Sequence, residues 1–302
     1  MPVELPSAFL AYADRGPDWA DWLSGVPRLS AQLLAEWELE RDGPALHGET
    51  AIVLPVLTAA KEPAVLKLGY PHAEAEHEHL ALRAWAGEAA VRLFRADPRR
   101  SALLLERADP GHDLHALPVV EACEVVAELY PRLHRDPLPQ LDRLSGHTAS
   151  WADELAVLRD ERSVPRRFVD QAIGLARDFA DDPDTDRALI HTDLHYANVL
   201  AAAREPWLVI DPKPMAGDPA YEVAPLLWNR WSEAVATHDL RGAVLERLFT
   251  VVDVAGLDED RVRGWVVVRE LVNVLWATRD GTATQDPSWI TRATTIVKAV
   301  QR

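Results

Sequence analysis

Hydrophobic positions in the first hundred residues change their spacing along the chain in a way that predicts a small sheet. Apolar side chains at helical intervals predict a helix over 17–40, and a second helix is predicted at 73–86. Runs with strand character are predicted at 37–40, 50–57, 64–68, 91–94 and 102–106. The order strand, loop, strand, strand, helix, strand, strand describes a small antiparallel sheet with one helix laid against it.

After residue 113 the pattern becomes mostly helical, and long helices are predicted at 119–134, 148–160, 165–180, 222–256, 259–279 and 286–300. Two short apolar runs within 198–211 interrupt the helices and are joined by a turn at 204–206. The pair Pro110 and Gly111 breaks the pattern between the two halves. We therefore expect an α+β, bilobal fold with an antiparallel-sheet N-lobe (1–108) and a mostly helical C-lobe (109–302).

The polar residues around this interruption indicate chemistry. Asp193 and Asn198 form the pattern Asp-x4-Asn, and Asp211 follows thirteen residues after Asn198, at the end of the next strand-like run. A hairpin between Asn198 and Asp211 would bring both side chains to the same end of a sheet, where one ion can bridge them. In phosphoryl transfer, one carboxylate accepts the proton of a substrate hydroxyl, while an amide oxygen and a second carboxylate hold magnesium on the nucleotide phosphates. We predict Asp193 as the catalytic base and Asn198 and Asp211 as Mg²⁺ ligands.

The N-lobe offers groups for a nucleotide. Lys67 lies among apolar residues of a strand whose neighbours should face the opposite side, so its ammonium requires phosphates or a carboxylate as partner. Glu78 is the best-placed carboxylate on the next helix, with Glu74 as the alternative. A loop at 41–49 with two glycines would cover the phosphates. Adenine would bond to the backbone near Glu106 and Ala108, at the hinge between the lobes.

Other interpretations of these residues stay open. His191, Asp193 and His195 alternate, so a metal-dependent hydrolase with imidazole and carboxylate ligands is conceivable. A catalytically inactive nucleotide sensor is disfavoured because every catalytic position is filled. A protein kinase is also disfavoured, because no long activation segment lies between Asp211 and the helix predicted from residue 222.

Charge and cysteine content limit the partners. The formal net charge of −16 argues against nucleic acid or an anionic membrane as the main partner and is compatible with a cationic substrate. The single cysteine, Cys123, excludes an intramolecular disulfide and indicates a reducing compartment, where a buried structural thiol is expected. We find neither a signal peptide nor an apolar run of membrane-spanning length. We expect a cytoplasmic protein that is a monomer or a weak dimer.

At this point the sequence resembles a known family. Lys67, Glu78, the Asp193–Asn198 pattern and Asp211 resemble the aminoglycoside phosphotransferases, a branch of the protein-kinase-like fold. Residues 191–201, 204–214 and 217–222, with 15–22 and 265–269, are similar to the subfamily of streptomycin 6-kinases and hydroxyurea phosphotransferases. The resemblance covers nearly the whole chain, although the glycine loop is sparse for this fold.

The resemblance implies an ATP- and Mg²⁺-dependent kinase that moves the γ-phosphate to a hydroxyl of a small molecule, with the nucleotide between the lobes and a role in antibiotic resistance. Asp218 would orient the loop after Asp211, as a helix N-cap. With Asp218, we predict Glu222, Glu270 and Asn273 as acceptor-binding residues, and these carboxylates favour a cationic acceptor. The alternatives are a streptomycin-like aminoglycoside, a hydroxyurea-type molecule or an unrelated metabolite, because fold membership does not settle the substrate.

Overall fold

The computed structural model describes residues 3–281, 286 and 288–301, and the chain divides into two compact units. The first unit comprises Met1–Pro110 together with Ala201–Ile210. The second unit comprises Gly111–Leu200 together with Asp211–Arg302. A segment from the middle of the sequence therefore belongs to the first unit.

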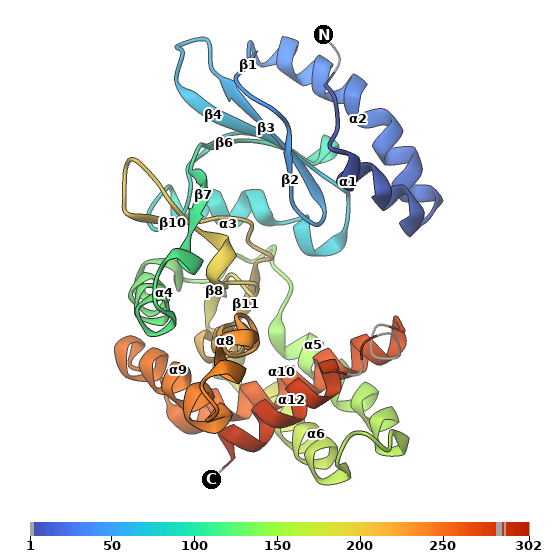
Figure 1. Cartoon of the computed structure of the whole chain (residues 1–302), viewed down its shortest axis with the longest axis vertical. Helices are drawn as coiled ribbons and strands as arrows, with labels where there is room; N and C mark the ends of the chain where they lie inside the picture. Colours follow the sequence, from blue (N-terminus) through green and yellow to red (C-terminus); the bar gives the residue numbers. More distant parts are fainter. Residues whose placement is uncertain (1–2, 282–285, 287, 302) are drawn as a thin grey trace. The chain divides into compact units, whose positions relative to one another are not determined.

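The first unit contains the predicted antiparallel sheet. Its strands run in the order β3, β4, β6, β5, and two short strands, β1 and β2, both pair with β3 (Figure 1). Their bounds are Glu40–Arg41 for β1, Leu46–His47 for β2, Ala51–Leu57 for β3, Pro63–Gly69 for β4, Leu93–Asp97 for β5 and Ala102–Glu106 for β6. All pairs are antiparallel, and Val53 of β3 lies opposite Lys67 of β4. The strands predicted around 50–57, 64–68 and 102–106 are confirmed.

The helix predicted over 17–40 is present as α2 (Pro17–Glu36) and packs against the sheet, a position that the sequence pattern did not indicate. After the short α1 (Ser7–Leu10), α2 packs its buried side chains against one sheet face, and Figure 1 shows it beside that sheet. The strand predicted at 37–40 is wrong in most of its length, because Trp37 caps α2 and is buried in the same core. Glu38 has a left-handed backbone (φ 53°) that a strand cannot contain, so pairing begins only at Glu40.

The two faces of the central strands differ as a period of two requires. Leu66 and Leu68 are fully buried in the core that α2 completes, and Lys67 between them points to the other face. There the helix predicted at 73–86 is present as a 3-10 turn (Ala73–Ala75) followed by α3 (Glu78–Trp85). Lys67 is thus directed toward α3 by the alternation along β4.

The segment 201–210 is attached to the first unit at two places. Its strand β10 (Trp207–Val209) is bonded through Val209, whose N–H donates to Ala89 and whose carbonyl accepts from Val91. The Arg204 guanidinium donates to both oxygens of Glu106, at 3.0 and 2.8 Å, and to the Ala90 carbonyl. Strands β7 (Asp109–Asp113) and β9 (Val199–Ala201) lie where the chain passes from one unit to the other.

The second unit is mostly helical, as predicted. Its longer helices are α4 (Val119–Leu133), α5 (Leu144–Glu154), α6 (Arg166–Asp181), α9 (Leu240–Ala255), α10 (Glu259–Arg279) and α12 (Ser288–Val300). Of the helix predicted at 286–300, Pro287 lies outside the described residues. A two-stranded sheet pairs β8 (Ala188–Ile190) antiparallel with β11 (Met215–Gly217). Along the part of the chain that the structure describes, the helices are all too short or too polar to cross a membrane.

One long helix was predicted wrongly. In place of a single helix at 222–256 the chain forms a 3-10 helix, η8 (Pro219–Val223), and then the helices α7 (Ala224–Trp228), α8 (Trp231–Ala236) and α9. Two residues with a left-handed backbone, Arg230 (φ 53°) and His238 (φ 62°), lie between these short helices and interrupt the helical path. The Asp239 side chain then caps α9 by accepting from the Gly242 N–H. Tertiary contacts hold the first break, since Arg230 donates to the carbonyls of Leu114 and Leu117.

Candidate active site

The pairing of β8 with β11 assembles the centre of the candidate site. Ile190, the last residue of β8, lies opposite Met215, the first residue of β11. The loop 191–198 leaves β8 at the same end at which residues 211–214 enter β11. Beyond the strands the contact continues, because the Lys213 N–H donates to the His191 carbonyl at 3.0 Å and the Thr192 hydroxyl donates to the Lys213 carbonyl at 2.6 Å. Asp193 and Asp211 are thereby held in neighbouring segments.

Asp193 lies in that loop with a partly exposed carboxylate. Lys213 Nζ is 3.1 Å from Asp193 Oδ2, and His195 Nε2 is 3.9 Å from Asp193 Oδ1. The Asp193 side chain is 29% exposed, so a ligand can reach it. The ammonium group of Lys213 thus places a positive charge directly beside this carboxylate.

Asn198 and Asp211 both lie close to His195. Asn198 Nδ2 is 3.3 Å from His195 Nε2 and donates to the Asp193 carbonyl at 2.8 Å, while the charge of Asp211 acts on the His195 ring. Burial lowers the pKa of His195, so the ring is neutral and does not repel a cation. Asp211 itself has a left-handed backbone (φ 57°), which is rare for a residue with a side chain and is found most often at functional sites.

This donor set fits magnesium. One carboxylate and one amide oxygen are hard ligands, and Mg²⁺ commonly takes one or two such protein groups and completes its shell with phosphates and water. Within residues 3–281, 286 and 288–301 there is no group of three or more His, Cys, Asp or Glu side chains that could hold a metal ion. The arrangement therefore supports a metal shared with a phosphate ligand, and gives no support to the alternative hydrolase centre of His191, Asp193 and His195.

Glu222 holds the backbone of the catalytic loop. It is fully buried, and its Oε1 accepts from the N–H groups of His191 and Thr192, each at 2.7 Å. Its Oε2 accepts from His134 Nε2 at 2.5 Å. Burial alone would raise the pKa of Glu222, but the hydrogen bond and the charge of His134 outweigh burial, so the pKa is lowered and the group stays ionised.

Thr192, directly before Asp193, needs this support. Its φ of 64° is in the left-handed region, which costs on the order of 1–3 kcal/mol for a residue with a side chain. The Glu222 carboxylate binds its N–H, and the Arg269 guanidinium donates to its carbonyl at 2.9 Å. Arg269 also lies over the ring of Tyr221, at 4.0 Å from the ring centre. The backbone N–H and the carbonyl of Thr192 are thus both hydrogen-bonded to charged side chains.

Asp218 performs the capping role that the sequence indicated. Its Oδ1 accepts from the Ala220 N–H at 3.0 Å, which makes it the N-cap of η8. Its Oδ2 accepts from Trp265 Nε1 at 2.6 Å and from Arg261 Nε. The side chain is fully buried, so these partners on α10 occupy the carboxylate.

Glu270 is a buried carboxylate of a different kind. It lies on α10, is 2% exposed, and its Oε1 has no hydrogen-bond partner among the residues that the structure describes. Burial raises the pKa of Glu270 to about 8, although the positive charges of Arg292 and Arg269 oppose this shift. Asn273, one turn further along α10, is half-buried. The nearby Trp276 is 44% exposed and packs edge-on against Trp151.

In the first unit, Lys67 and Glu78 form a close ion pair. Lys67 Nζ is 2.7 Å from each carboxylate oxygen of Glu78, and both side chains are largely buried. The structure therefore selects Glu78 rather than Glu74 as the partner that the sequence left open. Such a pair fixes the ammonium group in space and leaves it able to meet an anionic ligand.

The two residues predicted at the hinge differ in their surroundings. The Glu106 side chain is occupied by Arg204 and by the Arg92 N–H, which outweigh burial and lower the pKa of Glu106. The Glu106 N–H donates to the Arg92 carbonyl at 2.9 Å within the sheet. Ala108 is half-buried, beyond the end of β6. Neither side chain is placed to recognise a base, so a contact there would use the backbone.

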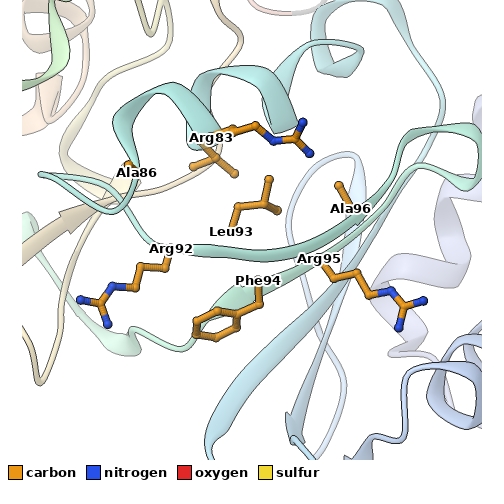
Figure 2. Close-up of a pocket in the computed structure, with 8 residues that line it drawn as sticks. Arg83, Ala86, Arg92, Leu93, Phe94, Arg95 and Ala96 are labelled. Carbon is orange, nitrogen blue, oxygen red and sulfur yellow. The ribbon is translucent and has the colours of Figure 1, made fainter.

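A pocket of ≈ 360 Å³ in the first unit lies apart from all of these residues. It lies between α3 and β5 and is lined by Arg83, Arg92, Phe94 and Arg95, among others. Figure 2 shows that the guanidinium groups of Arg92 and Arg95 extend in opposite directions. Because its cations do not converge and none of the predicted site residues lines it, we do not assign this pocket to the active site.

Sequence reasoning missed three residues that hold the site. Lys213 was visible beside Asp211, but its ion pair with Asp193 depends on the β8–β11 pairing. His134 and Arg269 lie on α4 and α10, far from the motif in sequence, and meet it only through Glu222 and Thr192. The sequence offered one signal for these residues. Arg269 is the charged residue at the end of the run 265–269, whose other members are apolar.

The fold and site together define a phosphotransferase of the protein-kinase-like class, and comparison with known proteins agrees. The aminoglycoside phosphotransferase APH(4)-Ia, solved as a thermostable mutant in a ternary complex with ADP and hygromycin B, superposes with a TM-score of 0.57. That match has 20% identity and covers 89% of this chain and 97% of the other. At this identity the likeness shows the fold alone.

Sequence comparison narrows the class. The chain is 40% identical over 299 residues to the streptomycin 6-kinase of Streptomyces glaucescens, covering 96% of each protein. It is 39% identical over 288 residues to the hydroxyurea phosphotransferase of Kitasatospora aureofaciens, covering 93% of this chain and 81% of the relative. Residues 36–281 match the family described as aminoglycoside/hydroxyurea antibiotic resistance kinase. The chain belongs to this family and is a small-molecule kinase.

Proposed function

We propose that this enzyme transfers the γ-phosphate of ATP, with Mg²⁺, to a hydroxyl of a cationic small molecule of the streptomycin type. The observation that carries the proposal is the partly exposed Asp193 carboxylate, held beside Lys213 in a loop that Glu222 and Arg269 fix. Asn198 donates to the Asp193 carbonyl and Asp211 lies in the neighbouring segment, and both offer oxygen donors suited to magnesium.

The first unit supplies the nucleotide contacts in this proposal. Lys67, oriented by Glu78, meets the phosphate oxygens. The turn at 48–50, at the end of the loop predicted over 41–49, covers the phosphates through the N–H groups of residues 49 and 50, since the Gly48 N–H donates to the Ala51 carbonyl. A Cβ at Gly48 would meet no atom within 4 Å, so the space beside its backbone is open to a ligand. The adenine bonds to the backbone near Glu106 and Ala108.

The proposed reaction moves one phosphoryl group and one proton. Asp193 accepts the proton of the acceptor hydroxyl, the acceptor oxygen forms a bond to the γ-phosphorus, and the bond to the β,γ-bridging oxygen breaks to release ADP. Asn198 and Asp211 would hold the metal, which when bound neutralises phosphate charge. Lys213 places a positive charge beside Asp193. Positioning and electrostatics supply most of the acceleration because the transition state is loose.

The acceptor side rests on Glu270 and Asn273. Asp218 and Glu222 were also predicted there, but both are fully buried with their oxygens occupied, so we assign them positioning roles. Across the described part of the chain, one oxygen of Glu270 has no hydrogen-bond partner, and a buried carboxyl group without a full set of partners is unfavourable. A guanidinium or ammonium group of the acceptor would satisfy it and release the proton that the raised pKa of Glu270 retains at neutral pH.

Sequence similarity does not identify the acceptor, since a streptomycin 6-kinase and a hydroxyurea phosphotransferase are almost equally similar to this chain. Glu270 favours the cationic streptomycin over the neutral hydroxyurea. The test is an ADP-release assay with each acceptor, in which the product is identified by mass spectrometry. Phosphorylation of streptomycin is expected. If hydroxyurea is phosphorylated and streptomycin is not, the proposed acceptor is wrong. If neither compound stimulates ADP release, the proposed substrate class is wrong.

Two further sequence-based predictions extend the proposal. We propose that the first unit is the nucleotide lobe and the second the acceptor lobe, and that the protein works in the cytoplasm as a monomer or weak dimer. Light scattering across a concentration series measures the oligomeric state, and a stable tetramer would contradict the proposed monomer or weak dimer.

A further inference from the structure

The motif at 15–22 has no part in the proposed chemistry, yet it builds a defined local structure. It joins the 3-10 helix η1 (Ala11–Arg15) to α2. Gly16 turns the chain between them with φ 140°, a conformation that residues with a side chain rarely adopt, and Pro17 starts α2 with its φ already set. This rigid turn determines where the Arg15 side chain projects.

Arg15 reaches across to the turn between β2 and β3. Its guanidinium lies 3.6 Å from the centre of the Tyr12 ring and 5.1 Å from that of Trp19. It donates to the Glu49 carbonyl at 3.1 Å and to Glu49 Oε2 at 2.9 Å. An exposed ion pair alone contributes little, but a guanidinium held on aromatic rings loses less freedom when it binds. Arg15 therefore binds both the backbone and the side chain of the turn.

Aromatic contacts reinforce the same connection. Phe9 and Tyr12 pack against His47, the last residue of β2, with ring centres 5.2 and 6.2 Å apart. Trp19 stacks on Tyr70 at 4.1 Å, with the rings nearly parallel. The Tyr70 N–H donates to the carbonyl of residue 50 at 2.7 Å. The turn is thus contacted on both of its sides.

The position of this turn gives the contacts a consequence for ligand binding. The Gly48 N–H donates to the Ala51 carbonyl at 2.9 Å, which closes the turn where β3 begins. Two residues further along β3, Val53 lies opposite Lys67. The turn therefore lies close to the lysine that the proposed function assigns to the nucleotide phosphates.

We propose that residues 7–22 form an N-terminal brace that holds the turn 48–50 in the conformation that covers the nucleotide phosphates, with Arg15 as its central positioning residue. The inference rests on the proposed function for nucleotide binding and adds a determinant of nucleotide affinity outside the kinase motifs. A loop that is ordered before the ligand arrives loses less conformational entropy on binding. The brace acts on nucleotide affinity and leaves acceptor binding unchanged.

The test compares Arg15→Met and Glu49→Ala with Arg28→Met, which removes an exposed arginine of α2. Binding of a non-hydrolysable ATP analogue is measured by calorimetry, and both KM values are determined. For R15M we expect the nucleotide Kd and KM to rise about five- to tenfold, on the order of a stacked guanidinium with two charge-assisted bonds. The acceptor KM of R15M and all parameters of R28M stay at wild-type values.

Hydrogen exchange separates the brace from a general loss of stability. In the nucleotide-free protein, R15M should speed exchange in 46–52 and leave 102–106 unchanged. The exposed E49A substitution should show a smaller change of the same kind, and the R15M/E49A double variant should be no worse than R15M alone. Unchanged exchange and nucleotide affinity in both single variants would overturn the brace.

The proposed function is tested independently by the wild-type protein. If the wild type binds the ATP analogue and R15M binds it equally well, only the brace is overturned. If the wild type does not bind the analogue at all, the proposed function fails, and the brace loses its assigned role with it.

Discussion

At the scale of single residues, the catalytic loop combines strained backbone with charged side chains that bind it. Thr192 and Asp211 are both left-handed, and they flank the segments that carry the reacting groups. The buried Glu222 and the guanidinium of Arg269 bind the peptide groups of Thr192, so ionic hydrogen bonds sustain the strain. The loop can then present Asp193 in one orientation, which is the condition for a proton acceptor that works by position.

Asp193→Asn should abolish most turnover and leave nucleotide binding nearly intact. The variant keeps the size of the side chain but cannot accept a proton, and such groups contribute about 10²–10⁴-fold. Steady-state kinetics and nucleotide Kd are the measurements. A variant that keeps more than about a tenth of the wild-type kcat would contradict the proposed role of Asp193.

Asn198→Ala and Asp211→Ala should each raise the magnesium requirement for nucleotide binding, because each removes an oxygen ligand from a hard cation. Binding of the ATP analogue is titrated with magnesium, so the result does not depend on turnover. Magnesium titrations that match the wild type in both variants would rule out these two residues as the metal site.

Glu270→Gln should change the pH dependence of stability. The pKa of Glu270 is raised to about 8, so the folded protein keeps a proton that the unfolded chain releases above pH ~4.5. This contribution is fully present below that pH and is lost as pH rises toward 8. Relative to wild type, the E270Q variant should gain several degrees of Tm between pH 5 and pH 9.

Glu222→Gln provides the contrasting control. The pKa of Glu222 is lowered, so its contribution is present above pH ~4.5 and is lost as pH falls through the folded value. E222Q should therefore be destabilised most at neutral pH and least in acid.

Parallel Tm curves for E270Q and wild type from pH 5 to 9 would show that Glu270 has no raised pKa.

At the scale of elements, short strands decide how the motif residues meet. The β8–β11 pair places Asp193 beside Lys213, although nineteen residues lie between these two in the chain. Between Asn198 and Asp211, the segment 201–210 packs in the first unit through Arg204 and Val209. The segment that joins the two proposed metal ligands is therefore anchored to the strand that ends at Glu106.

Arg204→Met tests that anchor. It leaves Glu106, which is largely buried, with fewer partners, and an under-paired buried charge costs on the order of 1–3 kcal/mol. A fall in Tm of several degrees is expected, with most of it already present in Glu106→Gln, so that the double variant is not additive. The exposed Arg162→Met serves as control. Equal Tm values for R204M and R162M would show that the anchor contributes nothing.

At the scale of the whole molecule, acidity matters for the approach of substrate. The formal net charge of −16 produces a negative field that attracts cations over the Debye length. Within the second unit, the partly exposed carboxylate of Asp193 can add to that attraction locally.

The efficiency of the enzyme toward a cationic acceptor should therefore fall as salt rises. Screening shortens the Debye length from about 10 Å at 0.1 M to about 3 Å at 1 M. The measurement is kcat/KM for streptomycin across that range, with nucleotide saturating. If the best acceptor is uncharged and its kinetics do not respond to salt, the proposal of a cationic acceptor is wrong, while the kinase assignment stands.

Local patterns in the sequence determined the strands β3, β4 and β6, most helices of the second unit and the need of Lys67 for a carboxylate from the next helix, with Glu74 and Glu78 as the candidates. These features depend on alternation and on spacing along one or two elements, which a sequence displays directly. Asp193, Asn198 and Asp211 could be recognised for the same reason, since they lie within one short stretch.

Only the tertiary structure decided the features that depend on distant segments. The helix predicted over 222–256 is broken because Arg230 bonds to carbonyls of 114 and 117, which outweighs the helical pattern. Glu222 holds the loop backbone rather than being free for an acceptor, because His134 and the strained peptide at Thr192 converge on it. Burial and pairing of a carboxylate are set by all the elements that pack around it, and no spacing along a single element records them.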